Sequence, residues 1–98
     1  ENSSPSWFGF CITCKDGVSR NELVKKIEAE NIQTRALFAG NLTRHPCFDQ
    51  IRGTDAYRIV GDLRETDRIM NNTFWIGVYP GMTDAMLDKM ISVIKASV

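Results

Sequence analysis

Three segments of the chain have the composition of β-strands. Residues Trp7 to Cys14 are aromatic and β-branched and run into a Lys-Asp-Gly turn, which predicts a first strand. Residues Ile32 to Phe38 are mixed in polarity, so we expect a second strand at a sheet edge, or one whose end faces a site. Residues Thr73 to Tyr79 are almost continuously apolar. This run indicates a third strand in the centre of the sheet, antiparallel to the other two.

Two longer segments have the spacing of amphipathic helices. Ser19 is followed three residues later by Glu22, which is the pattern of a capping box, and the helix that it begins should end near Asn31. Thr83 caps a last helix. The apolar stripes of these helices are formed by Leu23, Val24 and Ile27 in the first, and by Met86, Leu87, Met90, Ile91, Ile94 and Val98 in the last.

The stretch Ala39 to Asp62 has no clear element, and a loop of this length in a small domain is more often functional than idle. A short helix is expected at Arg64 to Met70, with Thr66 or Asp67 near its start. The element order predicts an α/β fold, specifically an α+β two-layer sandwich. It should contain a small mixed three-stranded sheet with helices on one face.

Composition restricts the class of protein. The 98 residues are 43% hydrophobic and 24% charged, as expected for one folded domain. Twelve Lys and Arg balance twelve Asp and Glu, so a formal net charge of zero argues against a nucleic-acid module, and no apolar run reaches the length of a membrane span. Residues 1–6 are polar and contain a proline, so we interpret them as an interdomain linker and residues 7–98 as the domain.

Cysteine and histidine do not form a recognisable reactive site. Cys11 and Cys14 could join His45 and Cys47 in a zinc site, but residues three apart in a strand point to opposite faces of the sheet. We interpret the three cysteines as small buried hydrophobes, and their odd number favours a reducing, cytoplasmic compartment. His45 has no companion at a suggestive spacing, so we expect a surface-loop histidine. No catalytic or metal-ligating residue is assigned.

Arginines and one aromatic residue are the remaining candidates for binding. Arg35, with Arg44, Arg52 and Arg58 of the long loop, could converge on phosphate or carboxylate oxygens, or could belong to a solvent-exposed loop. No glycine-rich phosphate loop is present. The segment Phe38 to Asn41 places a large aromatic beside a small flexible turn. Such a segment packs either on a flat ligand or in the core.

Five blocks of the sequence carry a family resemblance, namely Trp7 to Phe10, Thr34 to Arg44, Tyr57 to Gly61, Thr66 to Met70 and Thr73 to Gly81. They resemble the C-terminal part of the CDP-4-keto-6-deoxy-D-glucose 3-dehydratases. These enzymes belong to the DegT/DnrJ/EryC1/StrS-like sugar aminotransferase superfamily of fold-type I pyridoxal-phosphate enzymes, and serve lipopolysaccharide O-antigen synthesis. Two blocks, Leu-Phe-Ala-Gly-Asn and Phe-Trp-Ile-Gly-Val-Tyr-Pro-Gly, are the most specific. Cys11 replaces a common proline and His45 a common glutamine.

The resemblance implies a parent enzyme several times longer, in which residues 7–98 are the small C-terminal domain and residues 1–6 lead from an absent large domain. In that family, pyridoxamine phosphate (PMP) condenses with the 4-keto sugar and the C3 hydroxyl is lost. A [2Fe-2S] cluster and an NADH-dependent reductase then supply electrons. We expect PMP or PLP and the cluster to be bound mainly by the large domain, the parent to form a homodimer, and this chain alone to be inactive.

The resemblance also implies roles for four residues. The turn Phe38 to Arg44 would reach toward the cofactor and the CDP-4-keto-6-deoxyhexose substrate. We expect Phe38 to pack on the cofactor-sugar adduct, Asn41 to bond the sugar, and Arg35 and Arg44 to lie near the CDP diphosphate.

Two other functions stay open. A sugar-nucleotide aminotransferase of the same superfamily would have a lysine where the dehydratases have a histidine, upstream of Glu1. An autonomous ligand-binding regulatory α/β module is the alternative from another class, and it would bind its effector without further residues.

Overall fold

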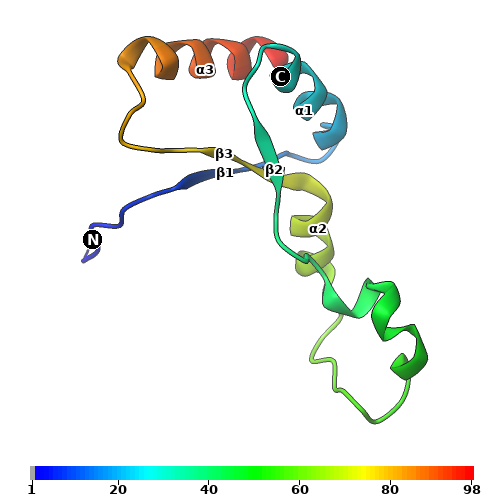
Figure 1. The fold of residues 1–98 in the computed structure, drawn as a ribbon. Helices are drawn as coiled ribbons and strands as arrows, with labels where there is room; N and C mark the ends of the chain where they lie inside the picture. Colours follow the sequence, from blue (N-terminus) through cyan, green and yellow to red (C-terminus); the bar gives the residue numbers. More distant parts are fainter. Residues whose placement is uncertain (1) are drawn as a thin grey trace.

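The structure is a computed structural model that describes residues 2–98. Its centre is a three-stranded sheet of order β1-β3-β2, in which β3 (Thr73–Gly77) pairs antiparallel with both β1 (Gly9–Thr13) and β2 (Thr34–Ala36) (Figure 1). The α/β class and the central place of the third strand are confirmed. The expectation of a mixed sheet is wrong, because β1 and β2 run in the same direction but never touch.

Two helices cover one face of this sheet. The first, α1 (Arg20–Ala29), begins at Ser19, whose hydroxyl accepts a hydrogen bond from the Glu22 amide at 3.3 Å. The other, α3 (Asp84–Ser97), begins at Thr83, whose hydroxyl accepts from the Met86 amide at 3.3 Å. Both expected caps are confirmed, and Figure 1 shows the two helices side by side above the strands. Asn31, just beyond α1, has the left-handed φ of 61° expected of it.

The core lies between these helices and the sheet. Ile27 of α1 is completely buried and Phe74 of β3 is almost so, with Leu23, Ile32, Ile76 and Cys14 around them. Met90, Val93 and Ile94 of α3 pack against this cluster. The apolar stripe of α3 is only partly covered, because Met86, Leu87, Ile91 and Val98 are exposed.

The opposite face of the sheet is open. Side chains alternate along β3, so Phe74 and Ile76 face the helices and Trp75 faces the other way. In Figure 1, α1 and α3 lie together on one side of the strands. The sheet therefore presents Trp75 of its central strand on the open face. The apolar run in the sequence had instead indicated a strand that other parts of the protein cover.

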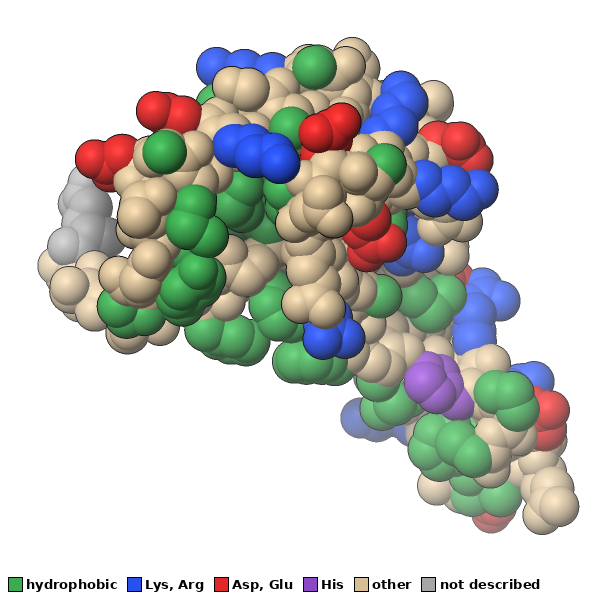
Figure 2. All heavy atoms as spheres, turned by 45° about the horizontal axis from the view of Figure 1, so that its top comes forward, with side chains coloured by type: hydrophobic (Ala, Val, Ile, Leu, Met, Phe, Trp, Pro, Cys, Tyr) green, Lys and Arg blue, Asp and Glu red, His purple; other side chains and the backbone are tan. Residues whose placement is uncertain are grey.

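Residues 39–63 form an arm that projects from the sandwich. The arm contains two 3-10 helices, η1 (Leu42–Arg44) and η2 (Pro46–Ile51), and leads into α2 (Arg64–Asn72), which continues directly into β3. The molecule measures 53 × 34 × 24 Å, and Figure 2 shows the arm with its single histidine extending from the main body. The expected helix at Arg64 is confirmed and ends two residues later than predicted, whereas all three strands are shorter than predicted.

Candidate functional site

An aromatic cluster of Phe8, Phe38 and Trp75 occupies the open face of the sheet. Both phenylalanine rings meet the indole edge-on, with centroid distances of 5.3 Å for Phe8 and 6.4 Å for Phe38. Gly9 leaves the space that the indole fills, since a Cβ at Gly9 would lie 2.6 Å from Trp75 Cε3. The side chain of Phe38 is 77% exposed. The cluster therefore offers ring surface to a further flat group.

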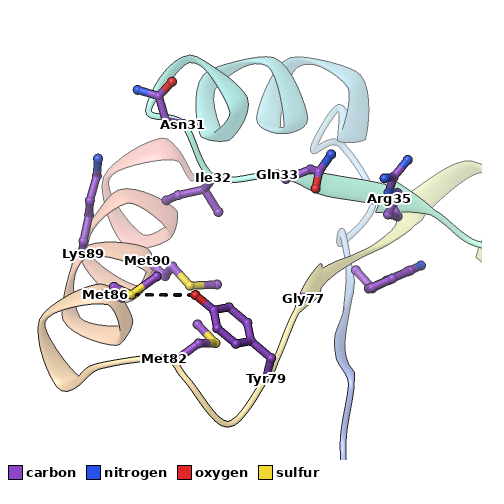
Figure 3. Close-up of a pocket in the computed structure, with 11 residues that line it drawn as sticks. Asn31, Ile32, Gln33, Arg35, Gly77, Tyr79, Met82, Met86, Lys89 and Met90 are labelled. Atoms are coloured by element: carbon purple, nitrogen blue, oxygen red, sulfur yellow. Dashed lines mark hydrogen bonds between the residues drawn. The ribbon is translucent and has the colours of Figure 1, made fainter.

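Beside Trp75, a groove of about 570 Å³ lies between β2, the end of β3 and α3 (Figure 3). Met82, Met86 and Met90 line one side, and the Tyr79 hydroxyl points toward the Met86 sulfur at 4.0 Å. The lining contains two cations, Arg35 and Lys89, and no acidic residue. Neither cation forms an ion pair within the described residues. We name this hollow the sheet groove; its chemistry suits an apolar group that carries negative charge.

The turn that joins β2 to the arm is unusually tight. Ala39 and Gly40 both have left-handed backbone, with φ of 49° and 63°, and the Gly40 amide donates to the Phe38 carbonyl. A Cβ on Gly40 would lie 2.9 Å from Met70 Sδ and 3.0 Å from Met70 Cβ. His45 Nε2 bonds the Ala39 carbonyl from the far side of the turn. The turn is thus held against α2 at its tip and by His45 behind it.

Asn41 is the buried polar centre of the arm, with only 3% of its surface exposed. Its Oδ1 caps η1 by accepting from the Thr43 amide at 3.1 Å and the Thr43 hydroxyl at 2.7 Å. Its Nδ2 donates to Asp67 Oδ1 at 2.7 Å. One Nδ2 hydrogen is left for any other acceptor, because an amide nitrogen carries two.

Arg44 and Asp67 form a two-point ion pair across the same site. Arg44 Nε donates to Asp67 Oδ1 at 2.8 Å, and Arg44 Nη2 donates to Asp67 Oδ2. The hydrogen bonds from Arg44 and Asn41 lower the pKa of Asp67 to about 2, and the bond to Asp67 raises the pKa of Arg44. The carboxylate therefore stays ionised throughout the neutral range.

Arg52 is used inside the arm. Its Nε donates to the Thr43 carbonyl at 3.0 Å, and its Nη2 lies 3.3 Å from the His45 carbonyl and 2.6 Å from Asp49 Oδ1. Arg52, Arg44, Tyr57 and Asp67 are among the residues lining a second hollow of about 530 Å³, which we name the arm hollow. Of these two arginines, Arg52 thus stabilises the loop itself, and Arg44 attaches the loop to α2.

Of the four candidate site residues, two lie on the open face of the sheet and two line the arm hollow. Arg35 lies opposite Trp75 in the sheet register, and Phe38 touches the same indole. Asn41 and Arg44 meet at Asp67 and line the arm hollow. The turn between them joins the two places.

Two residues of these places were not singled out by sequence reasoning. Trp75 lies within an apolar run, where nothing in the pattern marks which side chains face outward. Asp67 was noted only as a residue near a helix start. Its place in the first turn of α2 was a signal for a capping role, but its partners lie 23 and 26 residues away in sequence.

The cysteines only partly match their interpretation. Cys14 is buried, and burial raises the pKa of its thiol, as expected for a small hydrophobe. Cys11 and Cys47 are exposed, so the expectation of burial is wrong for them. Cys11 pairs with Trp75 on the open face while Cys14 enters the core, because β1 alternates. Over residues 2–98, no group of three or more His, Cys, Asp or Glu side chains could hold a metal ion.

A three-stranded antiparallel sheet with helices on one face, an open aromatic face and a projecting arm define a small α/β domain with two adjoining hollows. The chain belongs to the DegT/DnrJ/EryC1/StrS aminotransferase family, whose profile matches residues 1–95. The wider superfamily that the sequence blocks indicated, the sugar aminotransferases, is thereby confirmed.

Known relatives of the chain are much longer proteins. It is 56% identical over 94 residues to the lipopolysaccharide biosynthesis protein RfbH of Salmonella typhimurium, covering 94% of this chain and 21% of that protein. It is 50% identical over 92 residues to dTDP-4-dehydro-2,6-dideoxy-D-glucose 3-dehydratase of Saccharopolyspora spinosa, covering 92% of this chain and 19% of the relative. The chain thus spans about a fifth of the length of these relatives.

A solved structure has the same fold. It is a mutant of GDP-4-keto-6-deoxymannose-3-dehydratase (ColD) with bound GDP-perosamine, which matches with a TM-score of 0.70 at 20% identity. The match covers 92% of this chain and 22% of that one. Within residues 2–98 there is no helix of the length and hydrophobicity needed to cross a bilayer.

Proposed function

We propose that this chain is the C-terminal small domain of a PMP- or PLP-dependent 3-dehydratase that acts on a CDP-4-keto-6-deoxyhexose in O-antigen deoxysugar synthesis. Membership of the aminotransferase family supports the proposal, as do relatives named as sugar-nucleotide 3-dehydratases or as a lipopolysaccharide biosynthesis protein. The chain covers about a fifth of those relatives, so the enzyme would be completed by residues outside it, and the chain alone would be inactive.

The observation that carries the proposal is the open face of the sheet. Phe38 and Trp75 expose ring surface there, and Arg35 lies beside them without an ion pair among the described residues. An aromatic surface and a guanidinium without an ion pair among the described residues suit one wall of a site for a flat, anionic ligand. The reacting groups would come from the opposite wall.

Each candidate residue has a role in this proposal. Phe38 packs against the cofactor-sugar adduct, and Arg35 and Arg44 lie near the diphosphate from the two sides of the turn. Arg44 keeps Nη1 free for this purpose, because only Nε and Nη2 bond Asp67. Asn41 would bond the sugar through its second Nδ2 hydrogen, the first being donated to Asp67.

The cofactors would be held mainly by the part of the enzyme outside this chain, which would form the opposite wall of the site. When bound, PMP supplies the amine that condenses with the keto group of the sugar. This chain fits that cofactor only as a packing surface, through Phe38. The [2Fe-2S] cluster would not be held here, because Cys11 and Cys14 point to opposite faces of the sheet. The NADH-dependent reductase, the homodimer and the cytoplasmic location belong to the same proposal for the whole enzyme.

A turnover assay on the full-length enzyme with a CDP-4-keto-6-deoxyhexose tests the substrate assignment. Arg44→Ala should lower kcat/KM, whereas Arg64→Ala should not. Arg64 is a matched control in the same part of the chain, since it is 82% exposed and pairs only with Asp62. Unchanged turnover in Arg44→Ala would contradict the proposal.

A second experiment separates a half-site from an autonomous module. The 98-residue chain is titrated with CDP by calorimetry, and we expect no binding in the micromolar range. Micromolar binding by the chain alone would instead favour a self-sufficient ligand-binding module.

A sugar-nucleotide aminotransferase is the second candidate, favoured by the name of the matching family. The residue of the full-length protein at the cofactor-anchoring position decides between them, because a lysine there supports amino transfer and a histidine supports dehydration. Release of an amino sugar from the keto sugar with glutamate as donor would establish the alternative.

A further inference from the structure

Asp67 is a single carboxylate on α2 that receives hydrogen bonds from two of the candidate site residues. Asn41 Nδ2 and Arg44 Nε both donate to Oδ1, at 2.7 and 2.8 Å, and Arg44 Nη2 donates to Oδ2. Both carboxylate oxygens are therefore used inside the protein. The proposed function gives Asp67 no role.

The exposure of the pair is one-sided. The Asp67 side chain is 21% exposed, whereas the Arg44 side chain is 62% exposed. Arg44 Nη1 has no acceptor among the described residues, and this edge of the guanidinium lies away from the two nitrogens that bond Asp67. A planar guanidinium that is bonded through two of its nitrogens cannot rotate freely, so the direction of its third nitrogen, Nη1, is fixed.

Asp67 also belongs to the surface of α2 on which the turn rests. Met70 lies three residues further along the helix, on the same side, and it contacts Gly40 and accepts from the Asn41 amide at 3.3 Å. The turn is thus attached to α2 by one charged residue and one apolar residue. Losing either attachment would free the segment that carries Phe38 at one end and Arg44 at the other.

We propose that Asp67 is a positioning residue that fixes the segment Phe38 to Arg44 on α2 and directs the free edge of Arg44 toward the diphosphate of the nucleotide sugar. The identity of the ligand rests on the proposed function. The fixing of the segment does not.

Electrostatics and positioning make opposite predictions here. A carboxylate beside an arginine weakens the attraction of that arginine for an anion, because the pair is nearly neutral at a distance. If charge alone mattered, Asp67→Asn would strengthen binding of the diphosphate. If direction matters more, the same change would weaken it, since misplaced binding groups can cost about 100-fold in activity.

The test uses the full-length enzyme and its CDP-4-keto-6-deoxyhexose. We expect Asp67→Asn to raise KM by about 10- to 100-fold with a smaller effect on kcat. Glu65→Gln is the matched control, because Glu65 lies in the same turn of α2, is exposed and pairs only with Arg68. The double variant Asp67→Asn with Arg44→Gln should raise KM by less than the two single effects combined, because both changes remove the same Arg44 fork. An unchanged or lowered KM in Asp67→Asn, together with a raised KM in Arg44→Gln, would overturn the proposal.

Hydrogen exchange in the same proteins, without ligand, separates this inference from the proposed function. The amides of residues 40–45 should exchange faster in Asp67→Asn and normally in Glu65→Gln. Unchanged exchange in Asp67→Asn overturns the positioning role. Faster exchange together with a normal KM in Arg44→Gln supports that role and refutes the assigned ligand. If Asp67→Asn does not fold, Arg44→Lys makes the same test, because lysine leaves the carboxylate in place but cannot form the fork.

Discussion

Replacing Gly40 by alanine tests how closely the turn packs on α2. Two separate costs are expected at this position. Gly40 has a left-handed φ of 63°, and its new Cβ would lie 2.9 Å from Met70 Sδ and 3.0 Å from Met70 Cβ. The Cγ of Met70 is closer still, so the clash involves the middle of that side chain as well as its flexible end.

Gly61 offers a matched control for the backbone cost. It has a φ of 77°, and a Cβ there would meet no atom within 4 Å. The left-handed conformation costs a residue with a Cβ about 1–2 kcal/mol, and this cost should be shared by both positions. Only Gly40→Ala adds overpacking against Met70, which costs about 1–3 kcal/mol. We expect Gly40→Ala to destabilise the protein by about 2–5 kcal/mol in total.

Urea denaturation followed by circular dichroism measures both free energies of unfolding. A third variant, Gly40→Ala with Met70→Ala, should recover most of the packing cost because it removes Met70 Cγ and Sδ, the two atoms nearest the new Cβ, and leaves only the Met70 Cβ at 3.0 Å. Equal destabilisation by Gly40→Ala and Gly61→Ala would refute the close packing of the turn on α2, and with it the second attachment described for the positioning role of Asp67.

Three further predictions concern other parts of the structure. Asn41→Ala should lower the free energy of unfolding by about 1–3 kcal/mol, since it removes the cap of η1 and a buried hydrogen-bond donor. Asn41→Asp should also destabilise the protein, because it places a second carboxylate beside Asp67. The pKa of Asp67 is lowered from 3.8 to about 2, so its stabilising contribution is complete above pH 3.8 and is lost as the pH falls toward 2. Denaturation at a series of pH values should therefore show a constant difference between the protein and Asp67→Asn near neutrality that shrinks in acid; a difference that grows in acid would contradict this sign. Ile27→Ala should cost about 2–5 kcal/mol and Ile27→Val about 0.5–1.5 kcal/mol by the same denaturation assay, because Ile27 is completely buried, and equal costs would place it outside the core.

Local signals in the sequence were sufficient for most of the sandwich. Ser19 and Thr83 each cap an amide three residues away, so the bond and its sequence signature lie within one turn. The apolar run from Thr73 correctly indicated the central strand. The same run did not reveal that Trp75 faces outward, because a central strand with one open face has the same composition as one covered on both.

The arm was much less predictable, because its organisation depends on pairs of distant residues. Arg44 and Arg52 were expected either to bind a ligand or to lie in solvent. In the structure Arg44 bonds a carboxylate 23 residues away, and Arg52 bonds carbonyls of its own loop. An arginine can donate hydrogen bonds to many different oxygens, and the fold of the backbone determines which of them lie within reach. The start of α2 at Arg64 was predicted correctly, but its cap was not, since Leu63 caps the helix with a left-handed φ of 53° that the sequence does not indicate.

The two hollows are mechanically linked by the turn that separates them. Phe38 rests on Trp75 of the sheet, and Gly40, two residues later, rests on Met70 of α2. Because α2 continues directly into β3, Met70 and Trp75 lie on one unbroken stretch of chain. A shift of the turn on α2 therefore has to change either the contact of Phe38 with Trp75 or the backbone angles of Ala39 and Gly40, which already lie in the left-handed region. The position of the aromatic wall thus depends on the same few contacts that direct Arg44.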